Sequence, residues 1–152
     1  MTTTPSPRRE TRADAELAPR LRLTITRLAR RLRQQADLPG VSPTQISALS
    51  TIDRDGPQTL GELAGLERVQ PPTITSAVAR MEEQGLVLRR VDERDRRIHR
   101  VEVTNAGRKL LDKSRSRKNA YLERRLHALS DDERATIERA TALLEGILED
   151  DR

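Results

Sequence analysis

Residues 85–103 combine two short apolar-rich runs with an unbroken run of charge between them. The segment begins Gly-Leu-Val-Leu-Arg-Arg-Val, continues Asp-Glu-Arg-Asp-Arg-Arg and ends Ile-His-Arg-Val-Glu-Val. Short runs rich in valine and leucine on either side of a polar tip are typical of an antiparallel hairpin. A tip made only of charged side chains has no apolar surface to bury, so it must project into water or against a charged partner. The sequence therefore predicts a two-stranded hairpin with a charged tip.

A helix is expected directly before this hairpin. Pro71 and Pro72 favour a helix start, because proline in the first turn loses no backbone hydrogen bond, and Gly85 suits the left-handed residue that closes a helix. At 100° per residue one side of this helix is apolar, consisting of Ile74, Ala77, Val78 and Met81. The opposite side is polar and mostly slim, consisting of Thr73, Ser76, Arg80 and Glu83. We expect the first side to be buried and the second to be exposed.

Two further helices are predicted before this one. Ser42 followed by Pro43 is a helix start, and Asp55-Gly56-Pro57 is a stop. Thr59 with Glu62 three residues later is a capping box, and the short helix that it opens is expected to end near Gly65-Leu66.

A turn over residues 67–69 then joins this short helix to the next, which makes a helix-turn-helix. With the hairpin after it, residues 42–103 are predicted to form a winged helix-turn-helix lobe.

Long helices with apolar stripes flank this lobe on both sides. The first, over residues 13–38, has a stripe of Leu17, Leu21, Ile25, Leu28 and Leu32 and ends at Pro39-Gly40. Two more are expected over residues 104–150, opening at Thr104 and at a second capping box, Ser130 with Glu133. The last of these has a stripe of Ile137, Ala140, Leu144, Ile147 and Leu148. Because these helices have no lobe of their own to cover, we expect them to pack against the same elements of a second copy.

The predicted class is therefore mainly α (α+β), a winged helix-turn-helix with a two-stranded β-wing and with N- and C-terminal dimerisation helices. Residues 1–12 hold no apolar side chain beyond the initiator and are expected to form a flexible tail.

The composition of the chain limits the classes of partner that it is expected to bind. A net charge of +5 favours polyanions. Binders of single-stranded nucleic acid stack bases on aromatic rings, and Tyr121 is the one aromatic residue in the sequence, so duplex DNA is the better candidate. No apolar stretch approaches the roughly 20 residues of a membrane span, and residues 1–15 lack the apolar core of a signal peptide. A cytoplasmic protein is expected.

Catalysis and bound cofactors find no support in the sequence. The absence of cysteine excludes disulfides, thiolate metal sites and cysteine redox sensing. His99 and His127 lie far apart in the sequence and have no third histidine to complete a metal set. No cluster of serine, histidine and acid, glycine-rich phosphate loop or carboxylate pair stands out. We therefore expect neither an enzyme nor a cofactor, and Tyr121 is expected in the core or as a hydrogen-bond donor to a ligand.

Several motifs together resemble the MarR family of bacterial transcription regulators. They are Asp55-Gly56-Pro57, Leu60-Gly-Glu-Leu-Ala, Val69-Gln-Pro-Pro-Thr-Ile-Thr, Met81-Glu-Glu-Gln-Gly-Leu-Val, Asp92-Glu-Arg-Asp-Arg-Arg97, Val103-Thr104-Asn-Ala-Gly107 and Leu129-Ser-Asp-Asp-Glu133. The match runs from about Ala15 to Leu148, and the hairpin signature between its flanking Gly-Leu-Val and Thr-x-x-Gly is the most specific part.

This resemblance implies a symmetric homodimer in which the outer helices interlock and each copy presents one winged lobe to DNA. It further implies repression of genes and release of DNA when a small phenolic or other lipophilic anion binds near the junction of lobe and dimer helices. The chain departs from the family at Ser76, where arginine is common, so we expect weaker or different base readout there. It also has no apolar residue over 112–119, so that segment is not expected to line an apolar pocket.

Side chains at the start of a helix in the major groove reach base edges. The side chains placed to do so are Gln70, Thr73, Ser76 and Arg80: glutamine suits adenine, arginine suits guanine, and threonine touches a thymine methyl. Thr75, on the flank, is predicted to contact phosphate.

At the hairpin tip the predicted contacts are Arg94, Arg96 and Arg97. Arg97 aligns with the arginine that enters the minor groove in the family. Asp92 and Asp95 are expected to hold neighbouring arginine side chains. Second-rank phosphate candidates are Arg68, Arg89, Arg90 and Arg100.

The predicted function is therefore sequence-specific binding of a pseudo-palindromic duplex operator, with repression relieved by a small ligand. Two alternatives stay open. An architectural DNA binder indifferent to sequence would be favoured by the arginine-rich first helix, and a protein-interaction module would dock the wing on an acidic protein surface.

Overall fold

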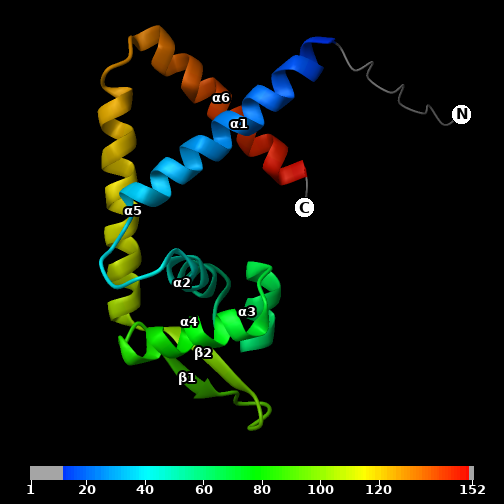
Figure 1. Ribbon diagram of the computed structural model, residues 1–152, viewed down its shortest axis with the longest axis vertical. Coiled ribbons are helices and arrows are strands. Elements are labelled where there is room, and N and C mark those ends of the chain that lie inside the picture. Colours follow the sequence, from blue (N-terminus) through cyan, green and yellow to red (C-terminus); the bar gives the residue numbers. More distant parts are fainter. Residues whose placement is uncertain (1–11, 151–152) are drawn as a thin grey trace, which may run out of the picture.

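A winged lobe and three long helices make up the part of the chain that the structure describes, residues 12–150 of a computed structural model (Figure 1). The elements follow in the order α1 (Arg12–Gln35), α2 (Pro43–Asp55), α3 (Leu60–Glu67), α4 (Pro71–Glu83), β1 (Val87–Val91), β2 (His99–Val103), α5 (Asn105–Leu126) and α6 (Asp131–Asp150). The predicted class and the predicted order of elements are confirmed. The tail predicted for residues 1–12 lies outside the described residues except for Arg12, which already begins α1.

The core lies inside the lobe, where α2, α3, α4, the hairpin and the first turns of α5 meet. Leu49, Leu63, Ile74 and Val78 are fully buried there, and Leu111 of α5 closes the cluster. The apolar side of α4 predicted from its helical period is thus confirmed as the buried one. No helix of the described region is long and apolar enough to cross a bilayer.

The hairpin pairs β1 and β2 antiparallel, with Val87 opposite Val103 and Arg90 opposite Arg100. A bond from the amide of Asp92 to the carbonyl of Ile98 (2.8 Å) continues the ladder towards the tip. Gln58, before α3, adds a short bridge to Val101 through bonds of 2.8 and 3.2 Å. The base of the wing is thereby attached to the segment that precedes the helix-turn-helix.

Helix starts predicted from capping residues are confirmed. The hydroxyls of Ser42, Thr59, Thr104 and Ser130 each accept a bond from the backbone amide three residues later, at 3.1 to 3.3 Å. The carboxylates of Glu62 and Glu133 return bonds to the cap amides at 2.8 and 2.9 Å, which completes the two predicted boxes. Gly85 adopts the left-handed conformation expected of it, with φ +68°.

Two helix ends differ from the prediction. α3 continues past the predicted end near Gly65-Leu66 to Glu67, and Arg68 takes a left-handed conformation (φ 53°) that is uncommon for residues other than glycine. The reason is the tight turn into α4, in which the Arg68 and Val69 amides bond back to the carbonyls of Gly65 and Ala64 (both 3.2 Å). α1 stops at Gln35 rather than at residue 38, because Leu38 and Val41 form a short bridge of their own.

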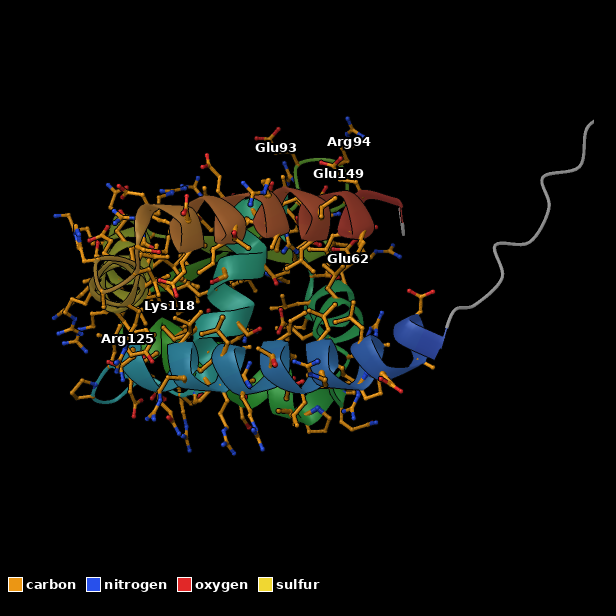
Figure 2. The ribbon with its side chains drawn as sticks, turned by 90° about the horizontal axis from the view of Figure 1, so that it is seen from above. Glu62, Glu93, Arg94, Lys118, Arg125 and Glu149 are labelled. Atoms are coloured by element: carbon orange, nitrogen blue, oxygen red, sulfur yellow. The ribbon has the colours of Figure 1, made fainter. Side chains whose placement is uncertain are left out.

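The outer helices leave most of their apolar surface uncovered. α5 rises from the lobe and α1 packs on it, whereas α6 has no extensive contact with any other element of the described chain. α1 and α6 overlap in Figure 1, but the view from above in Figure 2 shows that they lie apart, on opposite sides of the molecule. Leu17, Leu143 and Leu148 are 56%, 72% and 69% exposed. A single copy therefore presents two unpaired apolar helix faces.

Tyr121 does not lie in the core. It is only partly buried on α5, beneath the guanidinium of Arg125, whose central carbon is 5.3 Å from the ring centroid. Arg31 and Arg124 line the same open hollow. The expectation of a core tyrosine was wrong, because α5 extends beyond the lobe before it reaches this residue.

Candidate nucleic-acid interface

The polar side of α4 faces outward along its whole length. Thr73, Ser76 and Arg80 are exposed, as are Gln70 and Thr75, while Ile74, Val78 and Met81 on the opposite side are 0% exposed. A helix whose inner side is fully buried has one orientation, so these polar side chains point away from the lobe.

The start of α4 keeps its side chains available. Gln70 occupies the cap position without making a side-chain bond to the helix, so its amide is not consumed there. The Thr75 hydroxyl donates to the carbonyl of Pro71 (2.9 Å) and keeps its lone pairs for a further donor. Because the hydroxyl hydrogen is already donated to Pro71, Thr75 can bond a phosphate oxygen only after this hydrogen turns away from that carbonyl.

The tip of the wing is held by its own acids. Asp92 Oδ1 accepts bonds from the amides of Arg94 (2.8 Å) and Asp95 (3.2 Å), and Asp95 Oδ1 accepts one from the amide of Arg97 (2.9 Å). The expectation that these acids hold neighbouring arginine side chains is met by Asp92, whose Oδ2 accepts a bond from Arg100 (2.6 Å), but not by Asp95, which holds the tip backbone instead. The Arg94, Arg96 and Arg97 side chains are exposed, and Figure 2 shows Arg94 projecting from the hairpin tip.

Three of the second-rank arginines are paired with acids of the lobe. Arg89 bonds Glu82 (3.0 Å) and Arg90 bonds Glu102 (2.8 Å). Arg100 bonds both Asp92 (2.6 Å) and Glu62 (3.0 Å).

The ion pairs within residues 12–150 include none with Arg68, Arg80 or the tip arginines. Within the described winged lobe, residues 42–103, the arginines that no acid neutralises are thus those of the turn before α4, of α4 and of the wing tip.

Asp92 is the most perturbed acid of this region. Its bond from Arg100 lowers its pKa, the amides of Arg94 and Asp95 lower it further, and the result is about 2. The pKa of Glu62 is also lowered, first by the Thr59 amide and then by smaller contributions that include Arg100. Both carboxylates are therefore ionised at neutral pH.

An apolar hollow of about 240 Å³ lies where α1 ends against α2 and α5. Leu38, Val41 and Ile46 line it, with Arg33 and Lys118 as its cations and Asp37 as its acid. Lys118 is the one α5 residue in the lining, which fits the polar character of residues 112–119. No group of His, Asp or Glu suited to a metal ion occurs in the described residues.

The structure places the predicted side chains on one lobe, as the sequence led us to expect, but the pairing of Arg100 was not anticipated. Its two carboxylate partners lie 8 and 38 residues away in the chain, and no local pattern announces the second. Leu66, 51% exposed on α3, was also not anticipated as a surface residue.

Comparisons with known proteins agree with this geometry. The sequence model of the MarR family matches residues 41–99. The HTH-type transcriptional regulator ML2140 of Mycobacterium leprae is 37% identical over 87% of this chain and 92% of its own length. The HTH-type transcriptional repressor MdtR of Bacillus subtilis is 27% identical over 74% and 72%. The solved structure of a MarR family protein from Bacillus stearothermophilus superposes with a TM-score of 0.74 at 29% identity, covering 91% of this chain and 96% of that one.

Proposed function

This chain is a DNA-binding transcriptional regulator of the MarR family, and from that premise we propose that it acts as a homodimeric, sequence-specific repressor. The observation that carries the proposal is the shared exposure of the polar side of α4 and the tip arginines, none of which is neutralised by an acid of the described chain. In this proposal residues 42–103 bind DNA, and residues 13–38 and 104–150 hold two copies together.

Dimerisation is supported by the uncovered stripes of α1 and α6. Each large aliphatic side chain that becomes fully buried contributes about 1.5 to 3 kcal/mol, and several lie on each helix. A twofold axis would repeat the winged lobe, so the operator would be a pseudo-palindrome with half-sites about one helical turn, or roughly 34 Å, apart.

Base readout would come from the outward side of α4, from its cap residue Gln70 to Arg80 in its last turn. Gln70 and Arg80 suit bidentate bonds to adenine and guanine, and Thr73 suits a thymine methyl. Ser76 is short, so it would read its base pair through a single bond or through a water. Thr75, on the flank, would contact phosphate once its hydroxyl turns.

The wing would add a contact in the adjacent minor groove. Arg97 is the proposed groove residue, and Arg94 and Arg96 would bind the phosphates beside it. A narrow minor groove has an enhanced negative potential, and this potential attracts a guanidinium inserted into it. Of the second-rank candidates, Arg68 keeps an unpaired guanidinium for phosphate.

Repression and its relief are the remaining parts of the proposal. Occupation of a promoter by the dimer would exclude polymerase, and the similar protein MdtR is named a repressor. The hollow beside α2 would take a small phenolic or lipophilic anion, because its lining combines aliphatic side chains with two cations, Arg33 and Lys118, against one acid, Asp37. Binding there, between lobe and outer helices, would change the spacing of the two lobes and shift the population away from the DNA-binding arrangement.

The architectural alternative has one observation in its favour. The arginines of α1 are exposed along the helix: Arg20, Arg22, Arg27, Arg30, Arg31 and Arg33. If they, rather than α4 and the wing, carried the affinity, binding would have a steep salt dependence and little preference for any site.

Selection from a random duplex library by the full-length protein, in the presence of excess genomic DNA, tests the proposal. We expect enrichment of an inverted repeat with half-site centres about one turn apart. Retention of duplexes without any enriched sequence would establish the architectural alternative. Failure to retain any duplex would favour the protein-interaction module.

A further inference from the structure

The guanidinium of Arg100 joins the wing to the beginning of the helix-turn-helix. Its Nε donates to Asp92 Oδ2 (2.6 Å), where the hairpin passes into its tip. Its Nη1 donates to Glu62 Oε2 (3.0 Å) in the first turn of α3, and is 3.4 Å from the carbonyl oxygen of Pro57. One side chain thus contacts the wing and α3 together.

Both carboxylates are fixed by other bonds. Glu62 Oε2 also accepts the amide of Thr59 (2.8 Å), so it belongs to the cap of α3. The other oxygen of Asp92 accepts the amides of Arg94 and Asp95 and so holds the tip backbone. Because a guanidinium is planar and donates in fixed directions, these bonds define an orientation as well as a distance.

The outer half of the wing depends on this connection. An isolated two-stranded hairpin is only marginally stable and twists freely. At the level of Val101 the wing is bound to Gln58, and Arg89 at the same level bonds Glu82 of α4. Beyond that level, within the described residues, the bonds from the hairpin to the rest of the lobe are those of Arg100. The tip arginines therefore lie at the end of a hairpin whose outer half is bonded to the rest of the lobe through Arg100.

We propose that Arg100 is the positioning residue of the wing: through Asp92 and Glu62 it sets the angle between the hairpin and the helix-turn-helix, and with it the place where the tip arginines meet the minor groove. This inference rests on the proposed DNA contacts of α4 and the wing. It makes Arg100 a determinant of operator specificity that touches no base and no phosphate.

Arg90 offers a matched control. It lies directly opposite Arg100 in the strand register and carries the same charge. It is 66% exposed and pairs with Glu102 on its own hairpin, so it has no bond to α3. Replacing either arginine removes one positive charge at the same register position of the hairpin. Only the replacement of Arg100 also removes the bond between the hairpin and α3.

The first experiment compares Arg100→Met and Arg90→Met on the duplex selected by the unaltered protein. We expect Arg100→Met to lower operator affinity about tenfold and Arg90→Met less than about twofold. Guanine N7 protection in the major groove should persist in Arg100→Met, while hydroxyl-radical protection of the flanking minor groove is lost. Equal losses of affinity in the two variants, or loss of both protections together, would overturn the proposal.

Arg100→Lys separates positioning from charge. A lysine ammonium keeps the positive charge but cannot reproduce the paired, directed bonds to Asp92 and Glu62. We expect it to remain as defective as Arg100→Met, whereas restoration of full affinity would assign Arg100 to simple phosphate attraction. This variant also decides the matter if Arg100→Met does not fold, as judged by circular dichroism.

A measurement without DNA separates this inference from the proposed function. Residual dipolar couplings of the amides of residues 92–98 report the direction of the tip relative to α3 in the free protein. They should change in Arg100→Met and stay constant in Arg90→Met. Unchanged couplings in Arg100→Met refute the positioning role even if an operator exists. If no duplex is selected, the proposed function fails while the couplings still report the wing.

Discussion

Gly107, in the first turn of α5, lies against the backbone carbonyl of Leu86 so closely that a Cβ at position 107 would overlap the carbonyl oxygen. Such a Cβ would also lie 2.8 Å from Cγ1 of Val103. The approach is enforced by Thr104, whose amide donates to Leu86 O (3.0 Å) and whose hydroxyl donates to Gly85 O (2.6 Å). The long helix α5 and the winged lobe are thereby joined so closely that position 107 has no room for a side chain.

Replacing Gly107 with alanine should destabilise the protein. The clash is with backbone, which cannot rotate away, so we expect a loss of about 1 to 3 kcal/mol in the free energy of unfolding, measured in urea. Gly65→Ala is the control, because Gly65 is exposed within α3 and a Cβ there meets nothing within 4 Å. That change should raise stability by about 0.5 to 1 kcal/mol. A neutral Gly107→Ala would show that α5 is not seated as described.

Asp92 should titrate far below an ordinary aspartate. Its folded pKa of about 2 lies below the reference value of 3.8, so its bonds contribute fully to stability above about pH 4 and are lost as the pH falls from 3.8 towards 2. Carboxyl-carbon NMR should show a midpoint near 2. In Arg100→Met the midpoint should rise without reaching 3.8, because the amides of Arg94 and Asp95 still lower it. A midpoint near 3.8 in the unaltered protein would mean that the tip is not held by this carboxylate.

Local chemistry explains how much of the fold was predictable. Capping side chains act within three residues, so the starts of α2, α3, α5 and α6 could be read from Ser42, Thr59, Thr104 and Ser130. The buried side of α4 follows from its helical period alone. The end of α3 could not be read, because the left-handed residue is Arg68 and the turn that forces it depends on where α4 packs.

The candidate site likewise has features that local sequence predicts and features that depend on the folded structure. Exposure of Arg94, Arg96 and Arg97 follows from a hairpin tip that has nothing to bury. The partners of Arg89, Arg90 and Arg100 do not follow, since each depends on a register or a tertiary contact. The contact of Arg100 with Glu62 in particular exists only once the wing has folded beside α3, so the sequence alone cannot distinguish this arginine from a phosphate ligand.

Removing Arg97 should weaken operator binding. We expect Arg97→Ala to cost about 1 to 3 kcal/mol on the selected duplex, measured by gel retardation. Arg27→Ala, on the exposed side of α1, should have little effect under the same conditions. The reverse ranking would shift the DNA-binding surface from the wing to α1, as the architectural alternative requires.

Lys118 should contribute to effector binding. We expect salicylate, a small phenolic anion, to bind in the hollow and to release the operator, and Lys118→Met to reduce its affinity about fivefold to tenfold by calorimetry. Lys113→Met is the control, since Lys113 lies on the same helix but is exposed and outside the lining. Equal affinity in all three proteins would exclude this hollow as the site.

The dimer should depend on apolar side chains that a single copy leaves in water. Ile147 is 57% exposed on α6, so glutamate there costs the isolated chain little. In a dimer the same carboxylate would be buried without a partner, which costs several kcal/mol. We therefore expect Ile147→Glu to be a folded monomer by sedimentation, with unchanged helix content and with operator affinity reduced at least about a hundredfold because half-sites are bound singly. Ala142→Glu places the same charge on the opposite, exposed side of α6 and should remain a dimer, since that side faces water in either state. A dimeric Ile147→Glu would require the two copies to meet through another surface, and the spacing of the half-sites would then have to be derived again from that contact.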